Sequence, residues 1–229
     1  ARGGAVGMTR LGAGKDGREA IDRARGVGQL AVYLAKADLS DSYLDPAAAE
    51  GLLAVLRGFP GDVVRVHFAI QSAWFLARRG RHKEARAIIS TYSPDAFSHV
   101  AQHSAHLVAK AYLAVVARLP GARAAVQDAL ALASAQHAIR WQRIAELLKA
   151  SLGNGAELSN SIVNIGSAFP WHVTFLADIV SERVDELDAG AQTVIADAAR
   201  LHPGRWRFVL RERIATAGVG EGIRAARLL

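Results

Sequence analysis

Apolar residues recur at intervals of three and four positions along most of the chain, and this spacing is typical of amphipathic helices. The first such stretch, Arg18–Leu39, has its apolar positions at Ile21, Ala24, Val27, Leu30, Ala31 and Leu34. The same spacing predicts further helices over residues 47–58, 63–79, 82–92, 93–119, 122–136, 139–152, 156–168, 170–187, 191–201, 205–216 and from 220 onward. We therefore expect about a dozen helices.

Residues that start and stop helices stand between these stretches. Asp62 offers an N-cap for the helix that follows it, and Ser93-Pro94-Asp95 combines a capping hydroxyl, a first-turn proline and a first-turn acid. Gly80, Pro120-Gly121 and Gly153-Asn154-Gly155 break the helical pattern. These signals predict short connections between consecutive helices.

Strand patterns are weak by comparison. The β-tolerant segments are Ser161–Ile165 and Val173–Phe175, and neither shows a sustained apolar and polar alternation. We predict an all-α fold with a flexible N-terminal segment at residues 1–16 and one α-helical repeat domain at residues 17–229, which can be a fragment of a larger protein.

One stretch, Ala73–Ile89, is typical of a helical hairpin with a tight basic turn at Gly80. The turn at Gly80 followed by Ala85 matches a second turn at Pro120-Gly121 followed by Ala125. The two alanines are 40 residues apart. A single hairpin cannot bury both of its apolar faces, so neighbouring hairpins are expected to stack.

The first hairpin resembles a tetratricopeptide repeat over Gly61–Tyr92. The residues that carry the resemblance are Trp74, Leu76, Gly80, Ala85, Ile88 and Ile89, and His82 stands where the family has an aromatic residue. The resemblance implies a right-handed superhelix, a TPR-like α-solenoid, although a mixed array of the HEAT type has a similar pattern. It also implies a role like that of the helical sensor or scaffold regions of bacterial multidomain transcriptional regulators, which bind effectors or partner proteins.

A concave groove for a peptide or partner domain follows from this architecture. The polar residues of the first helices that are candidates for lining it are His67, Gln71, Arg78, His103, Lys110 and Arg118. The favoured function is therefore protein binding in a regulatory or sensor module. Exposed apolar ends of such an array also favour a homo-oligomer.

The charge raises nucleic acid as an alternative partner. The net charge is +7, and only five of the 28 basic residues are lysine. The residues that mix guanidinium groups with an aromatic plane are Arg205, Trp206, Arg207 and Arg211. In this alternative Trp206 or Trp171 contacts a base, whereas in the competing interpretation Trp206 packs inside a helical stripe and the arginines are solvated.

Metal binding is a further alternative. His99, His103 and His106 lie four and three positions apart on one predicted helix face, with Asp95 one turn earlier, and this spacing suits a divalent metal. The competing interpretation is a polar helix surface. The chain has no cysteine, which excludes disulfides and thiolate metal sites, and no resident cofactor is expected.

Catalysis has little support. Gly12–Asp16 is similar to a phosphate loop but lacks its opening glycine and its Ser or Thr, so a flexible terminus is the favoured interpretation. An acidic cluster without a nucleophile is interpreted as a solvated helix face, and it contains Asp178, Glu182, Asp185, Glu186 and Asp188. We therefore expect a protein without enzymatic activity.

No apolar run approaches the roughly 20 residues that cross a bilayer, the longest notable one being Ala111–Ala117. The first residues also lack the apolar core of a secretory signal. The expectation is a cytoplasmic protein that does not interact with membranes.

Overall fold

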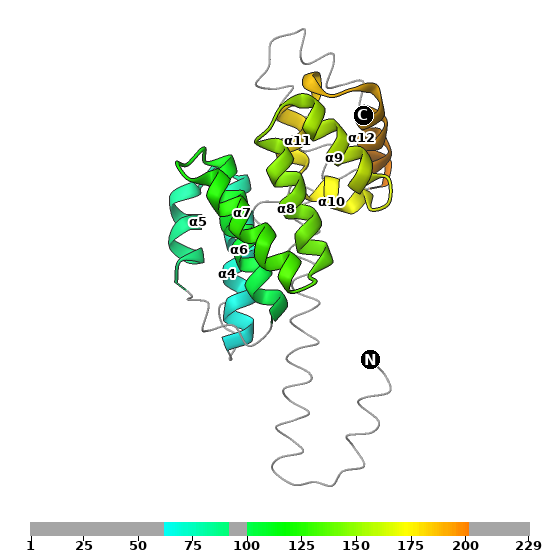
Figure 1. Ribbon diagram of the computed structural model, residues 1–229. Helices are drawn as coiled ribbons and strands as arrows, with labels where there is room; N and C mark the ends of the chain where they lie inside the picture. Colours follow the sequence, from blue (N-terminus) through cyan, green and yellow to red (C-terminus); the bar gives the residue numbers. More distant parts are fainter. Residues whose placement is uncertain (1–61, 92–99, 202–229) are drawn as a thin grey trace.

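The computed structural model describes residues 62–91 and 100–201, and within these ranges all regular secondary structure is helical (Figure 1). The helices are α4 (Asp62–Arg78), α5 (His82–Ile89), α6 (Val100–Val116), α7 (Ala122–Ala135), α8 (Ile139–Ser151), α9 (Gly155–Gly166), α10 (Pro170–Phe175), α11 (Ala177–Glu182), the 3-10 turn η2 (Val184–Glu186) and α12 (Ala189–Leu201). This confirms the predicted all-α class. The helices predicted over residues 18–39, 47–58 and beyond 204, and the N-terminal segment 1–16, lie outside the described residues.

The helices pack as consecutive hairpins. Each of α4/α5, α6/α7 and α8/α9 forms a packed pair, and α4 packs on α6, α6 on α8, α8 on α10 and α10 on α12. In Figure 1, α4 to α7 lie on one side, α9 to α12 lie on the other, and α8 stands between them. Among the described residues, no helix is both long and apolar enough to span a membrane.

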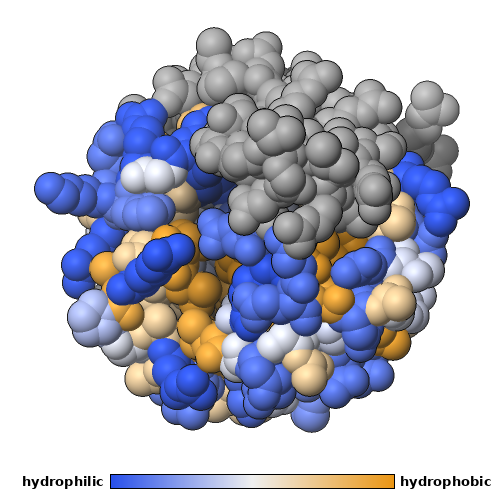
Figure 2. All heavy atoms as spheres, turned by 90° about the horizontal axis from the view of Figure 1, so that it is seen from above, coloured by the Kyte–Doolittle hydropathy of each residue, from blue (hydrophilic) through white to orange (hydrophobic). Residues whose placement is uncertain are grey.

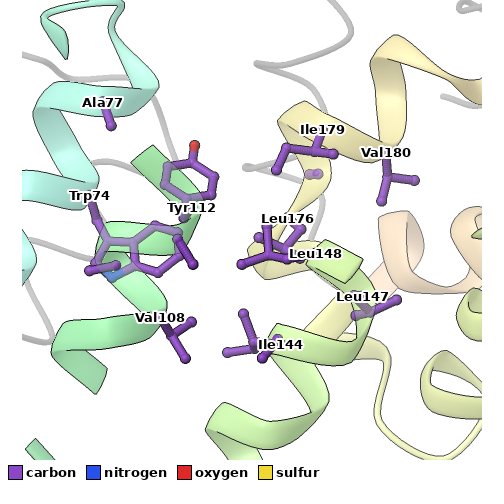
Figure 3. Close-up of a cluster of buried hydrophobic side chains, with 14 of the residues drawn as sticks. Trp74, Ala77, Val108, Tyr112, Ile144, Leu147, Leu148, Leu176, Ile179 and Val180 are labelled. Atoms are coloured by element: carbon purple, nitrogen blue, oxygen red, sulfur yellow. The ribbon is translucent and has the colours of Figure 1, made fainter. Parts of the chain in front are cut away.

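The core lies where these helices meet. Trp74 of α4 and Tyr112 of α6 extend toward Leu148 of α8 and Leu176, which joins α10 to α11 (Figure 3). All four side chains are at least 98 % buried. Burial of large apolar side chains at this centre supplies the main favourable free energy of folding.

Two hairpin turns close alike, at the end of α4 and at the end of α6. At the end of α4, Gly80 has φ +72° and the Arg81 N–H donates to the Leu76 carbonyl at 2.9 Å. After α6 the same place is taken by Arg118, with φ +50° and a Leu119 N–H to Ala114 carbonyl bond of 2.9 Å. The residues that close the two turns are thus 38 positions apart, so Gly80 corresponds to Arg118 and not to Gly121. The second helices keep the expected interval of 40 residues, because Ala85 and Ala125 are each the fourth residue of α5 and α7.

The helix predicted over residues 170–187 is a second correction, because the chain breaks at Leu176 and again at Arg183. The buried apolar residues keep a helical interval across both breaks, at Val173, Leu176, Ala177, Val180, Val184 and Leu187. Periodicity therefore gave no sign of the change in direction. Tertiary contacts accompany it, since Arg183 Nη1 donates to the Ser151 carbonyl at 2.7 Å.

Candidate interaction surface

Aromatic rings from four helices form a continuous chain of contacts. The Trp74 ring centroid lies 4.0 Å from that of Tyr112 and 4.5 Å from that of Phe175. Phe175 in turn lies 4.9 Å from Trp171 and 6.3 Å from Trp141. Contacts of this kind stabilise beyond the apolar area that they bury.

Two arginines pack on these rings. The Arg78 guanidinium carbon lies 5.4 Å from the Trp74 ring and 4.9 Å from the Phe175 ring, and its Nη2 donates to the Phe175 carbonyl at 3.3 Å. The Arg140 guanidinium carbon lies 4.2 Å from the Trp171 ring and 5.1 Å from that of Trp141. We call these seven residues the arginine–aromatic cluster: Trp74, Arg78, Tyr112, Arg140, Trp141, Trp171 and Phe175. Cation–π contacts hold both positive charges at fixed positions.

The cluster reaches the surface at the start of α8 and α10. Ile139 is 55 % exposed and Phe169 is 52 % exposed, which is unusual for large apolar side chains among the described residues. The Phe169 ring meets the His172 ring edge-to-face, with 5.4 Å between centroids. We call Ile139, Arg140, Phe169 and His172 the outer edge of the cluster. Exposed apolar groups beside fixed charges suit the binding of another molecule.

His172 at the outer edge has a lowered pKa. Burial lowers the pKa of His172 below its usual value, a hydrogen bond with the Phe169 backbone opposes this, and the nearby charges of Arg140 and Arg143 lower the pKa further. Neutral imidazole is therefore favoured at neutral pH. Arg143, one source of this positive charge, pairs with Glu146 at 2.8 Å.

The residues predicted to line a groove lie on α4 and α6 and in the turn after α6. Gln71, His103 and Lys110 are half-buried, and Arg118 is exposed. Arg78 packs against Phe175, so α10 covers the chain at that point. The side chain of the remaining candidate, His67, is outside the described residues, and so are the nucleic-acid candidates Arg205, Trp206, Arg207 and Arg211.

The predicted histidine site has one member, His99, outside the described residues. His106 is buried, and a ring N–H at Nε2 donates to the Ile89 carbonyl at 2.8 Å. Burial lowers the pKa of His106, the bond to Ile89 opposes this, and Lys110 and His103 lower the pKa further. In the described part of the chain, no group of three or more His, Asp or Glu side chains is placed to hold a metal ion.

Four of the five residues of the acidic cluster are exposed, in agreement with a solvated helix face, and some of its members also make structural contacts. Asp178 accepts a hydrogen bond from the Tyr112 hydroxyl, and Asp188 Oδ1 accepts the Ala191 N–H at 2.8 Å, which caps α12. Glu186 pairs with Arg183. These carboxylates therefore hold α11, η2 and α12 in place.

Sequence reasoning missed most of the arginine–aromatic cluster. It selected Arg78 for a groove and Trp171 for a base contact, but did not connect either to Arg140, Trp141 or Phe175. A signal was present in Ile139-Arg140-Trp141-Gln142-Arg143 and Phe169-Pro170-Trp171-His172, which mix aromatic and basic residues as Arg205–Phe208 does. Only the packing of α8 on α10 brings the two segments together.

Apolar side chains are visible on the face seen from above the view of Figure 1. Hydrophilic side chains cover most of the described surface there, and apolar side chains show in a depression between hydrophilic rims (Figure 2).

Comparison of the chain with protein-family models, curated proteins and solved structures found no match.

Proposed function

We propose that the chain is a protein-interaction module of TPR-like helical hairpins, stacked as a right-handed α-solenoid, that binds a peptide or partner domain. Hairpins that pack in chain order, each first helix against the next, support this proposal. So do positions 38 residues apart that have equal roles: Trp74 stacks on Tyr112, and Gly80 and Arg118 close successive turns with positive φ. In such an array each unit buries the apolar face of its neighbour.

The observation that carries the binding function is the outer edge, where large apolar side chains stay exposed beside fixed guanidinium charge. Aromatic residues and arginine are enriched among the residues that dominate binding energy at protein interfaces. The Arg140 guanidinium already packs on the Trp171 and Trp141 rings, which restricts its side chain before any partner binds. The resemblance to helical regions of bacterial transcriptional regulators supports a regulatory or sensor role in a cytoplasmic protein.

Selection from a library of short random peptides tests this function. We expect peptides that bind the full chain with Kd of about 1–100 μM, and we expect Phe169→Ser to weaken their binding by about tenfold or more. The matched control is Leu201→Ser, because Leu201 is also an exposed apolar side chain, at 64 %, but ends α12. Circular dichroism verifies that both variants keep their helices.

Selected peptides that bind both variants as tightly as the unaltered chain would place binding elsewhere. A selection that gives no specific peptide would contradict a peptide-binding function. Fluorescence polarisation of labelled peptides provides the affinities.

Nucleic acid is the second candidate partner, and the stacking of Arg140 on Trp171 favours it. Aromatic and guanidinium planes together grip unpaired bases and phosphates in single-strand-binding proteins. A single-stranded oligonucleotide whose affinity falls steeply with salt, and which competes with no peptide, would support this alternative.

Native mass spectrometry of the purified chain tests the remaining alternatives in one experiment. A bound divalent metal that is lost in His103→Ala would support a metal-dependent helical enzyme that uses the predicted histidines. A dimer mass would support the expected homo-oligomer. A metal-free monomer agrees with the interaction module.

A further inference from the structure

Positive charge gathers at the turns that join α4 to α5 and α6 to α7. Residues 79–86 and 117–124 together contain six lysines and arginines and one carboxylate, that of Glu84. We call these two segments the basic turn edge. Their net charge is +5, against +7 for the whole chain, so the charge of the protein is concentrated at these turns.

The packing of α4 on α6 brings the two turns together. Both helices have 17 residues, and Trp74 stacks on Tyr112 at equivalent positions. The turns that follow the two helices therefore lie at the same end, which is the upper end in Figure 1. Because helices in direct contact lie about 8–10 Å apart, the two turns form one continuous edge.

Most of the cations of this edge face solvent without a carboxylate partner. Lys83, Arg86, Arg118 and Arg123 are exposed, and none of the four forms an ion pair with a described residue. Arg123 Nη2 donates to the Leu152 carbonyl at 3.3 Å, which leaves its charge uncompensated because that acceptor is neutral. Clustered charges of one sign raise the local concentration of oppositely charged ligands. An anionic ligand is therefore favoured at the basic turn edge.

The edge offers a ligand charge and few other contacts. It contains no Trp, Tyr or Phe, and no Ser, Thr, Asn or Gln. The large apolar side chains that are exposed in the described residues, Ile139, Phe169 and Leu201, all lie outside it. Hydrophilic side chains cover most of the described surface in the view of this end (Figure 2). The ligand must therefore be one that charge alone can hold.

This requirement separates the classes of anionic ligand. Peptides and membrane surfaces are held largely by apolar and aromatic anchors, and single strands by bases that stack on aromatic rings. An RNA duplex is recognised through its 2′-hydroxyls as well as its phosphates, and the edge has no hydroxyl or amide side chain for them. Double-stranded DNA can be bound through phosphate contacts alone.

We propose that the basic turn edge binds the phosphate backbone of double-stranded DNA independently of base sequence. Duplex DNA presents one negative charge for about every 1.7 Å of its axis, so several phosphates can face the two turns at once. The outer edge lies at the starts of α8 and α10, apart from these turns. The inference therefore goes beyond the proposed function and does not rest on it.

Titration of the full chain with a short DNA duplex tests the inference. We expect a Kd of about 1–100 μM at physiological salt, and equal affinities for two duplexes of unrelated sequence. The logarithm of the binding constant should fall linearly with the logarithm of the salt concentration, by about 0.9 for each phosphate that a cation neutralises. Four exposed cations thus predict a slope between about −3 and −4.

Variants locate the contact at the turns. Lys83→Gln combined with Arg118→Gln removes one charge from each turn, and neither side chain makes a hydrogen bond or ion pair with a described residue. We expect this pair to weaken DNA binding by about tenfold or more and to reduce the salt slope by about two. Lys83→Arg combined with Arg118→Lys should bind like the unaltered chain, because a phosphate accepts either cation.

A control matched in net charge is Arg143→Gln combined with Arg200→Gln. These two arginines already pair with Glu146 and Asp197, away from the basic turn edge. The control should keep the salt slope of the unaltered chain. Circular dichroism verifies that all variants keep their helices.

Three results would overturn the inference. The first is that the duplex does not bind. The second is that the control pair weakens binding as much as the pair at Lys83 and Arg118. The third is that single-stranded DNA, duplex RNA or vesicles of anionic lipid bind more tightly than duplex DNA.

The proposed function fails separately from this inference. Phe169→Ser should weaken the binding of selected peptides and leave DNA binding unchanged. Lys83→Gln combined with Arg118→Gln should do the opposite. A chain that binds DNA at the turns and no peptide would contradict the proposed function and leave the inference standing.

Discussion

At the scale of single residues, Arg118 and His137 end their helices in the left-handed backbone region that usually takes glycine. Their φ values are +50° and +52°, and Gly80 has the same role with +72°. A residue with a Cβ is strained there, by roughly 1 kcal/mol. Equivalent turns are therefore closed by glycine at Gly80, where this backbone conformation is unstrained, and by Arg118, where it is strained.

Arg118→Gly should stabilise the fold by up to about 1 kcal/mol, since relief of backbone strain exceeds the entropy that glycine adds to the unfolded chain. Gly80→Ala should destabilise it by about 1 kcal/mol, although no atom crowds an added Cβ at Gly80. Urea denaturation measures both. Equal stabilities for the two variants would contradict the backbone argument.

Buried histidines make the stability depend on pH. Burial lowers the pKa of His106 in the folded state below the unfolded value of about 6.5, so the unfolded chain binds more protons at mildly acid pH. The stabilisation is complete above that unfolded value and is lost as the pH falls through the folded pKa. His172 contributes with the same sign.

We expect His106→Gln to reduce the loss of unfolding free energy between about pH 7 and pH 5, because the amide can donate to the Ile89 carbonyl and does not titrate. Thermal or urea unfolding across this range measures the slope. Part of the slope should remain because of His172. An unchanged slope would show that His106 does not contribute.

At the scale of elements, α9 sits close to two neighbours at Gly166. A Cβ built there would lie 2.5 Å from Val194 Cγ1 and 2.7 Å from Val173 Cγ2. Glycine thus allows α9 to approach both α12 and α10. Local propensity alone would instead favour alanine in a helix.

Gly166→Ala should therefore destabilise the protein by about 1–3 kcal/mol through overpacking. Gly190→Ala is the matched control, since the nearest atoms, Asp188 Oδ1 and Val163 Cγ2, are 3.3 and 3.6 Å away. The control should change stability by less than about 1 kcal/mol. Equal effects of the two substitutions in denaturant unfolding would contradict the close-packing argument.

Helix ends were predictable where their capping is local. Asn154 Oδ1 accepts the Glu157 N–H at 2.9 Å and begins α9, close to the boundary that Gly153-Asn154-Gly155 predicted. The break at Leu176 was not predictable, because the apolar interval passes through it unchanged. The residues on either side of this break contact helices that are distant in the sequence. Phe175 packs on Trp74 of α4, and Asp178 accepts a hydrogen bond from Tyr112 of α6.

At the scale of the whole molecule, the arginine–aromatic cluster connects the first described helix to the last third of the chain. The bond from Arg78 to the Phe175 carbonyl spans 97 residues of sequence, and that from Tyr112 to Asp178 spans 66. These contacts cover the inner side of Arg78, a residue predicted to line a groove. The outer edge is the exposed part of the arginine–aromatic cluster.

Helix periodicity, caps and turn residues act over a few neighbouring positions, so the all-α class and most helix bounds of the described residues could be predicted from the sequence alone. Which face of each helix meets which partner follows from packing in three dimensions, because periodicity marks a buried face and does not identify the helix that covers it. The tertiary structure made Arg118, not Gly121, the counterpart of Gly80, divided the helix at Leu176, and joined Arg140 to Trp171. The candidate site depends on such contacts between distant segments, and no local rule encodes them.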